Sequence, residues 1–182
     1  SLILLSGATV LLFLLLLAGA FDRRPLNRIF FLQADTTGIP NAPNGITHWT
    51  LYNHCSSHNG INTACGPNSA AYPIDPVRNF GTRTGIPSSF VHHPSKYFYL
   101  SRFLYAFYII TLFFTLCALA LSLAACLSPL ATYLATACAL AATLSAAFCA
   151  AVMTAVYEMA ARAWRHDGRQ ARIGVKATAF TW

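Results

Sequence analysis

The stretch Phe103-LYAFYIITLFFTLCALALSLAACLSPLATYLATACALAATLSAAFCAAVMTAV-Tyr157 has no charged side chain between Arg102 and Glu158. At ~1.5 Å of rise per residue, one continuous helix over this stretch would be about 80 Å long, whereas the hydrocarbon core of a bilayer is ~30 Å thick. The stretch is therefore long enough to cross a membrane twice, and we expect two helices in it.

The break between these helices is marked by Ser128 and Pro129. A serine can cap the free amides at a helix start, and a proline fits the first helical position because its missing N–H needs no partner there. The sequence thus predicts a transmembrane hairpin with helices at 96–124 and 129–157. A cytoplasmic turn at 125–128 joins them.

The composition agrees with a membrane protein. Hydrophobic residues make up 56% of the chain and charged residues only 9%, and the mean hydropathy is +0.52. Soluble domains carry about a quarter charged residues. The net charge of +7 comes without a dense Lys/Arg block or a nucleic-acid-binding motif. We therefore assign the charge to residues that flank membrane spans and expect no nucleic-acid partner.

Two further apolar segments flank the hairpin. Residues 1–21 predict a first transmembrane helix; a signal peptide is the alternative, but its apolar region is usually only ~7–15 residues long. Residues 158–173 form a basic extracellular link, and 174–182 predict the start of a fourth transmembrane helix. Because this last segment is short and the chain starts at Ser1, we expect the sequence to be a piece of a longer protein.

Residues 22–95 differ from the rest of the chain. They are rich in Asn, Pro, Gly, Ser, Thr and His, and turn signals such as Asn59-Gly60 recur. Trp49-Thr50-Leu51-Tyr52 is rich in strand formers. The predicted fold class is therefore an all-α membrane protein: a four-helix transmembrane bundle, truncated in its fourth span, with a small, disulfide-bonded, partly β extracellular domain at 22–95.

The disulfide is predicted between Cys55 and Cys65. The intervening segment contains the Asn59-Gly60 turn, which would bring the two cysteines together as in a hairpin. Trp49 is the large side chain close enough in sequence to pack beside the bridge. The other cysteines lie in the apolar hairpin and are interpreted as small hydrophobic residues; they are Cys117, Cys126, Cys138 and Cys149.

Charge and cysteines point to opposite orientations of the large loop. The basic residues that flank the spans would lie on one side with the loop, and the positive-inside rule would make that side cytoplasmic. These residues are Arg23, Arg24, Arg28, Arg162, Arg165, Arg169, Arg172 and Lys176. A disulfide instead favours an oxidising compartment, and the charge rule applies poorly to loops beyond ~60 residues. We predict an extracellular loop.

Alanines recur at steps of three and four along the third predicted helix and trace one face. They are Ala131, Ala135, Ala139, Ala142, Ala146 and Ala150. Small residues at this spacing allow close helix packing within a membrane, although alanine is abundant throughout this helix. Whether the face meets a helix of the same chain or of another copy stays open.

The sequence shows no catalytic motif, and we predict a protein that is not an enzyme and has no cofactor. A zinc site could be drawn from His48, His54, His58 and the two loop cysteines, but their spacing fits no standard pattern and a disulfide accounts for the cysteines. No metal is therefore expected. The lack of ionisable groups within the 103–157 stretch argues against a transporter or channel.

Two motifs make the chain resemble a known family. One is Thr47-His-Trp-Thr-Leu-Tyr-Asn-His-Cys55 followed by Cys65, and the other is Ala70-Ala-Tyr-Pro-Ile-Asp-Pro-Val-Arg-Asn-Phe80. The order of these motifs, followed by a helical hairpin whose first helix begins with many aromatic residues, resembles the fungal Sur/PalI family of four-span plasma-membrane proteins. The first motif is also similar, more distantly, to the first loop of claudin-like proteins. The residues that carry the resemblance, besides the cysteines, are Trp49, Leu51, Tyr72, Pro73, Asp75, Pro76, Asn79 and Phe80.

The resemblance implies a non-enzymatic organiser of eisosome-associated domains of the fungal plasma membrane, linked to cell-wall integrity, endocytosis and sphingolipid balance. The alternative is an accessory subunit of a larger membrane complex, such as a PalI-like ambient-pH-sensing receptor or a membrane enzyme. The implied partners are membrane lipids, including sphingolipids or sterols, and other membrane proteins or copies of the chain itself. Both branches of the family stay open.

Overall fold

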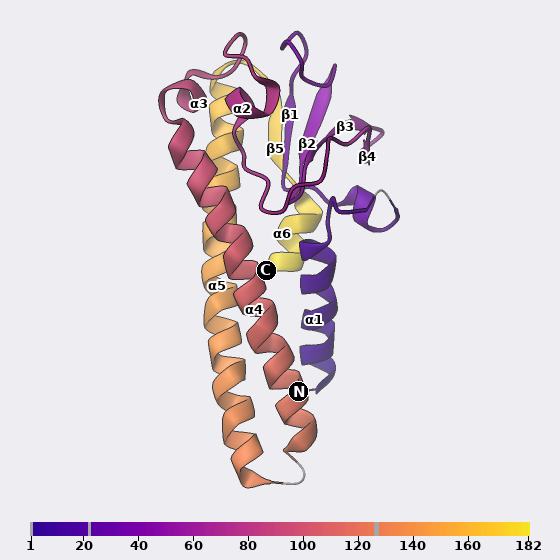
Figure 1. Cartoon of the computed structure of the whole chain (residues 1–182), viewed down its shortest axis with the longest axis vertical. Helices are drawn as coiled ribbons and strands as arrows, with labels where there is room; N and C mark the ends of the chain where they lie inside the picture. Colours follow the sequence, from indigo (N-terminus) through magenta and orange to yellow (C-terminus); the bar gives the residue numbers. More distant parts are fainter. Residues whose placement is uncertain (1, 22, 126–127) are drawn as a thin grey trace.

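The computed structural model describes residues 2–21, 23–125 and 128–182 and has two parts. Three long helices, α1 (Leu2–Leu16), α4 (Pro94–Ala124) and α5 (Pro129–His166), run side by side, and a small sheet covers one end of them (Figure 1). α4 packs against both α5 and α1. The long axis of the molecule follows the helices.

The α4–α5 hairpin agrees with the sequence prediction. Both helices are long and apolar enough to cross a membrane, and α1 is a shorter apolar helix. Pro129 occupies the first turn of α5, directly after Ser128 in an extended conformation. Cys126 and Leu127, which belong to the predicted turn, lie outside the described residues.

α5 continues past residue 157, where the sequence analysis placed the end of the helix, and ends at His166. The segment after Tyr157 is charged, which resembles the end of a membrane span, but a helix does not have to stop where a membrane does. Glu158 accepts hydrogen bonds from Arg162 (3.1 Å) and Arg165 (2.6 Å) along the same helix. Spacings of four and seven residues place both arginines on the same helix face as Glu158, and these pairs support the extra turns.

The sheet has five antiparallel strands in the order β4-β3-β2-β1-β5. Their bounds are β1 (Leu32–Asp35), β2 (Ile46–Trp49), β3 (His54–His58), β4 (Ile61–Thr63) and β5 (Ala171–Ile173). β5 pairs with β1, with Leu32 opposite Ile173 and Ala34 opposite Ala171. It comes from the segment after α5, which the sequence analysis treated as a simple link, so the sheet draws on both ends of the chain.

The described residues also form four short helices. η1 (Leu26–Arg28), α2 (Pro76–Phe80) and α3 (Ser88–His92) lie in connecting segments, and α6 (Val175–Thr181) follows β5. α6 packs against α1 and α5. The chain enters α6 through Gly174, whose N–H donates to the carbonyl oxygen of Phe31 (2.9 Å). A Cβ at Gly174 would collide with the backbone carbonyl of Phe30. Only glycine lets the two backbones pass this closely.

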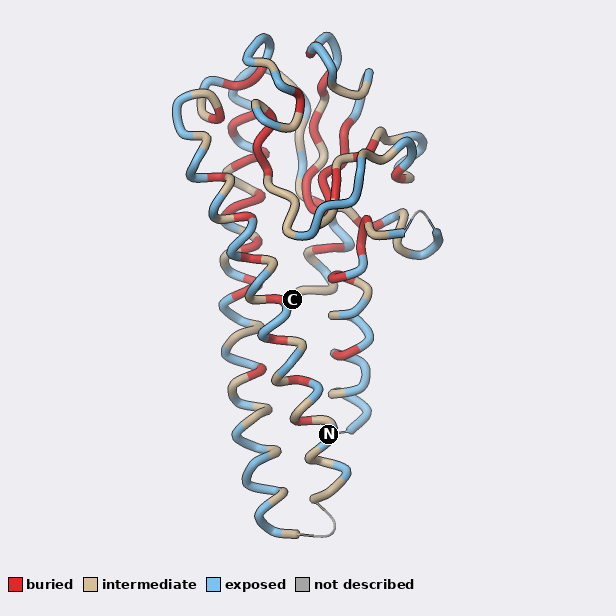
Figure 2. The backbone as a smooth tube through the Cα atoms, in the orientation of Figure 1, coloured by how far each residue is buried: buried red, intermediate tan, exposed pale blue. Residues whose placement is uncertain are grey.

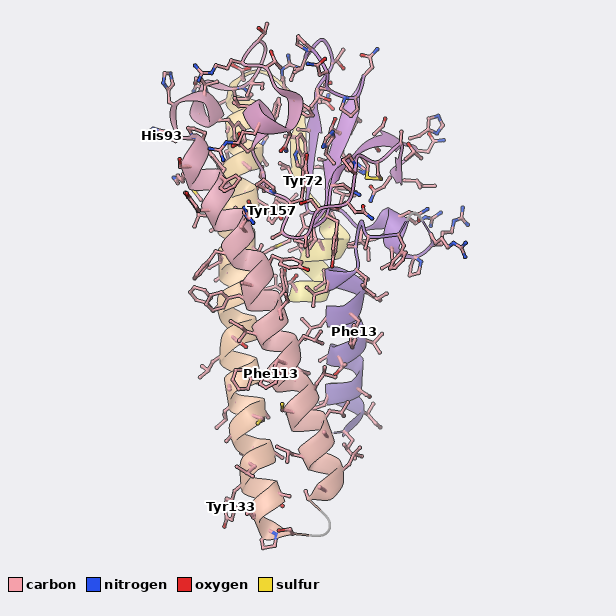
Figure 3. All side chains as sticks on the ribbon, viewed as in Figure 1. Phe13, Tyr72, His93, Phe113, Tyr133 and Tyr157 are labelled. Atoms are coloured by element: carbon pink, nitrogen blue, oxygen red, sulfur yellow. A yellow bond between two sulfur atoms is a disulfide. The ribbon has the colours of Figure 1, made fainter. Side chains whose placement is uncertain are left out.

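Buried residues are concentrated where the sheet meets the helices (Figure 2). The largest fully buried side chains include Trp49, Trp164 and Tyr157. Farther along the hairpin, Phe113 and Tyr133 project outward (Figure 3) and are 60% and 77% exposed. Large apolar side chains are thus exposed along the hairpin, whereas aromatic side chains are buried where the sheet meets the helices. This distribution agrees with a protein whose helices, away from the sheet, are surrounded by lipid.

Candidate functional site

The junction between sheet and helices is an aromatic cluster built from four elements. The Trp49 ring on β2 lies 6.1 Å from Trp164 on α5 and 6.0 Å from Phe80 on α2, measured between ring centroids. Phe90 on α3 lies 5.8 Å from Trp164. Aromatic pairs at such distances add stabilisation beyond the area they bury. The sheet domain and the hairpin therefore share one core.

The two family motifs meet at one wall of this cluster. The Tyr72 hydroxyl and His54 Nδ1 are hydrogen-bonded at 2.8 Å, and the Tyr72 amide donates to the carbonyl oxygen of Leu51 (2.9 Å). Burial lowers the pKa of His54 and raises the pKa of Tyr72 to about 12. Both side chains are therefore neutral near pH 7. The His54 and Phe80 rings are nearly perpendicular, with centroids 5.3 Å apart.

The second motif forms a capped helical turn that holds Phe80 in place. Asp75 Oδ1 accepts a hydrogen bond from the Arg78 amide (3.3 Å), and Asp75 Oδ2 lies 3.2 Å from Arg78 Nε. Burial raises the pKa of Asp75, and the nearby Arg78 opposes that shift. Asn79 Nδ2 donates to the carbonyl oxygen of Pro73 (3.2 Å). Asp75 is thus the N-cap of α2, Pro76 is its first residue, and Gly81 ends it in a left-handed conformation.

The predicted disulfide is confirmed. Cys55 and Cys65 are bonded, with Cα atoms 4.0 Å apart, and the bond ties the end of β4 back to β3. Between them, Asn59 and Gly60 both have positive φ, 52° and 72°, as the tight turn requires. The bridge constrains the outer edge of the sheet.

The expected contact between Trp49 and the disulfide is wrong. In the β2–β3 register Cys55 lies opposite His48, and His54 lies opposite Trp49. Because successive side chains of a strand point to opposite faces, Trp49 and the disulfide lie on opposite faces of the sheet. Trp49 turns toward Trp164 because that face is covered by the helices, where a large apolar ring is removed from water.

On the other face, His48 is the centre of a buried polar network. Its ring stacks on Phe30 at 3.8 Å, Nδ1 lies 2.6 Å from Asn62 Oδ1, and Nε2 lies 3.2 Å from Gln33 Oε1. Asn62 in turn donates to the carbonyl oxygen of Ile29 (3.0 Å). Burial lowers the pKa of His48 to about 4, so the ring is neutral at pH 7. The spacing of the loop histidines suggests only a zinc ligand at His48 and gives no sign of this network.

The residues considered above as zinc ligands do not form one site in the structure. Both cysteines are in the disulfide, His48 is held by Asn62 and Gln33, and His54 by Tyr72. Across residues 2–21, 23–125 and 128–182, no group of three or more His, Cys, Asp or Glu side chains is placed to hold a metal ion. His48 and His54 are used for hydrogen bonding within the sheet domain, and His58 is exposed.

The alanine face of α5 points toward helices of the same chain. Ala142 and Ala150 are buried, and the other four alanines are half-buried. Ala139 lies beside Leu5 of α1 and contributes to two cavities of about 280 and 330 Å³ between the helices. Nearby, the Thr111 hydroxyl of α4 donates to the Ser145 hydroxyl of α5 (3.1 Å). Small side chains let α4 and α5 approach closely along this face.

Comparison with known proteins agrees with this architecture. The sequence model described as the SUR7/PalI family matches residues 1–182. The chain is 37% identical to Protein SUR7 of Candida albicans and 32% identical to Protein SUR7 of Saccharomyces cerevisiae, each over the whole chain. These matches cover 66% and 60% of the relatives' lengths. The chain therefore spans about three fifths to two thirds of these relatives.

A third relative is the S. cerevisiae plasma membrane protein YNL194C, 35% identical over 100% of this chain and 61% of its own length. The relatives are thus fungal proteins, and one of them is named as a plasma membrane protein. The two membrane-length helices of this chain agree with such a location. With a family match over its whole length and identities above 30%, the chain belongs to the SUR7/PalI family.

Proposed function

We propose that this chain is a non-enzymatic organiser of fungal plasma-membrane domains of the eisosome-associated type. In this role it acts through lateral contacts in the membrane and through its sheet domain outside, and it thereby affects cell-wall integrity, endocytosis and sphingolipid balance. Membrane lipids, other membrane proteins and further copies of the chain are the proposed partners.

The observation that carries this proposal is the shared core of sheet and helices. Trp49 of the sheet packs on Trp164 of α5, and Phe31 of the β1 segment packs on Tyr157 of the same helix, 5.2 Å between ring centroids. A sheet joined to the helices in this way cannot swing independently of them. Contacts made by the outer domain would therefore set the position and orientation of the helices in the bilayer, as a scaffold requires.

The proposal includes four membrane spans with the sheet domain outside the cell. α1, α4 and α5 supply three, and α6 begins the fourth. Packing of α6 against α1 and α5 supports this arrangement, and so does the hydrogen bond of 2.8 Å between Thr181 of α6 and Tyr108 of α4. The disulfide favours the extracellular side for the sheet.

Copurification from native fungal membranes tests the proposed function. The full-length protein is solubilised mildly, crosslinked at short range, and separated by size. Assemblies made mainly of this protein, which concentrate in discrete plasma-membrane patches when a fluorescent tag is attached, are the expected result. A uniform distribution of single copies at native expression level would contradict the proposal.

The alternative role, an accessory subunit, is favoured by one observation: Phe113 and Tyr133 project outward from the hairpin as exposed aromatic side chains (Figure 3). A helix of a larger receptor or membrane enzyme would pack on this outer surface. The same copurification separates the two roles, because an accessory subunit would be recovered with one large partner in a fixed ratio.

A further inference from the structure

We propose that a cavity at the sheet end of α1 binds the headgroup of an anionic phospholipid. The inference deepens the proposed function, since it rests on the proposed membrane location and assigns a lipid-binding site to it. The cavity, of about 310 Å³, lies where η1, α1 and α6 meet. η1 and α6 are both found beside the end of α1 nearest the sheet (Figure 1).

The rim of the cavity is basic. Arg24 and Arg28 come from the loop around η1, and Lys176 comes from α6. All three side chains are exposed, and within the described part of the chain none of them forms an ion pair. Residues 22–28 together with Lys176 carry four basic side chains and one acidic one. The rim therefore keeps a net positive charge that favours an anion.

The floor of the cavity is apolar. It is lined by Leu14 of α1, by Ile29, which follows η1, and by Phe180 of α6. Lys176 and Phe180 are four residues apart on one helix, so they share a face, with the ammonium group nearer the sheet and the ring nearer the membrane interior. A cationic rim above an apolar floor matches an amphiphile with an anionic head and a hydrocarbon chain. A soluble phosphate would leave the floor unused.

The position of the cavity relative to the bilayer also suits a lipid. α1 ends at Leu16, and Arg24 and Arg28 follow this end by 8 and 12 residues, on the side of the bilayer that carries the sheet. A Lys or Arg close to an anionic bilayer surface contributes about 1 kcal/mol of attraction, or roughly fivefold in affinity. In the proposed arrangement the sheet lies outside the cell, so the ligand is an anionic lipid of the outer leaflet. Because three such basic side chains surround one cavity, their attraction for anionic lipid is concentrated at a single binding site.

The other cavities lack this combination. The larger one, about 610 Å³ beside Phe98 on α4, has Arg102 in its lining. There Arg102 and Arg78 both lie over the Phe98 ring, at 5.2 and 4.5 Å from its centroid, and Arg78 is ion-paired with Asp75. The lining of this cavity thus contains one cationic residue, whereas three surround the cavity at the sheet end of α1. The cavities along α5 have no charged residue in their lining.

The test is native mass spectrometry of the full-length protein in detergent, titrated with dioleoylphosphatidylglycerol, dioleoylphosphatidylcholine or glycerol 3-phosphate. The wild-type protein should bind the anionic lipid at least tenfold more tightly than the zwitterionic one. Replacing two rim charges, Arg28→Gln with Lys176→Gln, should weaken the anionic lipid roughly thirty-fold. Lys176→Arg, which keeps the charge, should bind as the wild type does.

The matched control removes one arginine charge and one lysine charge at positions outside the cavity. Arg83 and Lys96 are exposed and lie outside this cavity, so Arg83→Gln with Lys96→Gln should keep the wild-type preference. If the rim variant fails to fold, Lys176→Gln alone replaces it, with a loss of about fivefold expected. Equal binding by rim and control variants would overturn the proposal. Displacement of the lipid by an equal concentration of glycerol 3-phosphate would also overturn it, because the site would then be one for soluble phosphate.

Crosslinking of the same samples in liposomes separates this site from the proposed function. A rim variant that loses the lipid preference while self-association persists is the result expected for the lipid site. Equal lipid binding by both variants with normal self-association would reject the site alone. A wild-type protein that prefers the anionic lipid but never self-associates would reject the organiser role and leave the site in place.

Discussion

At the scale of single residues, the Cys55–Cys65 bond is expected to supply a large part of the stability of the sheet domain. A loop of this length restricts the unfolded chain by about 2–3 kcal/mol. Cys55→Ser with Cys65→Ser should lower the free energy of unfolding by that amount, followed by tryptophan fluorescence in detergent. Cys117→Ser with Cys138→Ser is the control, since both cysteines are free and lie in α4 and α5. An unchanged melting temperature after reduction of the wild type would contradict the prediction.

His48 should make the sheet domain sensitive to acid. Its pKa in the folded protein is lowered to about 4 from 6.5 by burial. Between these two values the unfolded chain binds more protons, so stability is fully present above about pH 6.5 and is lost as the pH falls toward 4. The full difference corresponds to about 3 kcal/mol.

The groups around His48 define the test. Phe30 covers the ring, Asn62 and Gln33 face its two nitrogens, and Arg172, which donates to Gln33 (3.1 Å), lies behind them. His48→Gln should be less stable at pH 7 but should lose less further stability between pH 6.5 and 4.5. His58→Gln, at an exposed position, should keep the wild-type slope. Identical slopes in the wild type and His48→Gln would refute the role of this side chain.

At the scale of elements, the alanine face of α5 determines how closely the helices approach. Ala150 belongs to this face, is buried, and lines neither of the cavities along α5. Ala150→Leu should therefore destabilise the helix bundle by about 1–3 kcal/mol, as overpacking does. Titration with denaturing detergent, followed by circular dichroism, measures the loss.

Ala137 offers a matched control because it lies on the same helix but is exposed. Ala137→Leu adds the same volume where lipid can make room for it, so stability should stay close to the wild-type value. If the two variants behaved alike, the alanine face would not be a packing surface.

At the scale of the whole molecule, the arrangement predicts opposite locations for the two ends of the helical body. A tag inserted at Asn59, in the β3–β4 turn, should be accessible from outside the cell, and one at Leu127, between α4 and α5, should be cytoplasmic. A tag at Gly38, in the loop between β1 and β2, is the internal control and should report the same side as Asn59. Both Asn59 and Leu127 tags on one side would disprove the hairpin crossing.

The sequence by itself was sufficient for features that depend on neighbouring residues. The uncharged run, interrupted at Pro129, predicted the α4–α5 hairpin, and two cysteines around an Asn59-Gly60 turn predicted the disulfide. Hydropathy, a proline at a helix start and short loop closure are properties of a local segment, so they can be derived without knowledge of the fold. Ser128 precedes α5 but makes no side-chain capping hydrogen bond, so that part of the prediction is wrong. The motifs also sufficed for the family.

Only the tertiary structure decided which distant segments meet. β5 forms a strand because β1 offers its edge, and Trp49 turns away from the disulfide because Trp164 covers the other face of the sheet. Neither partner is near in sequence. Likewise, Arg28 and Lys176 become one basic rim only when α6 packs on α1. Strand pairing and the burial of one face of a sheet depend on partners that are distant in sequence and that the fold brings together. They therefore cannot be predicted from the neighbouring residues alone.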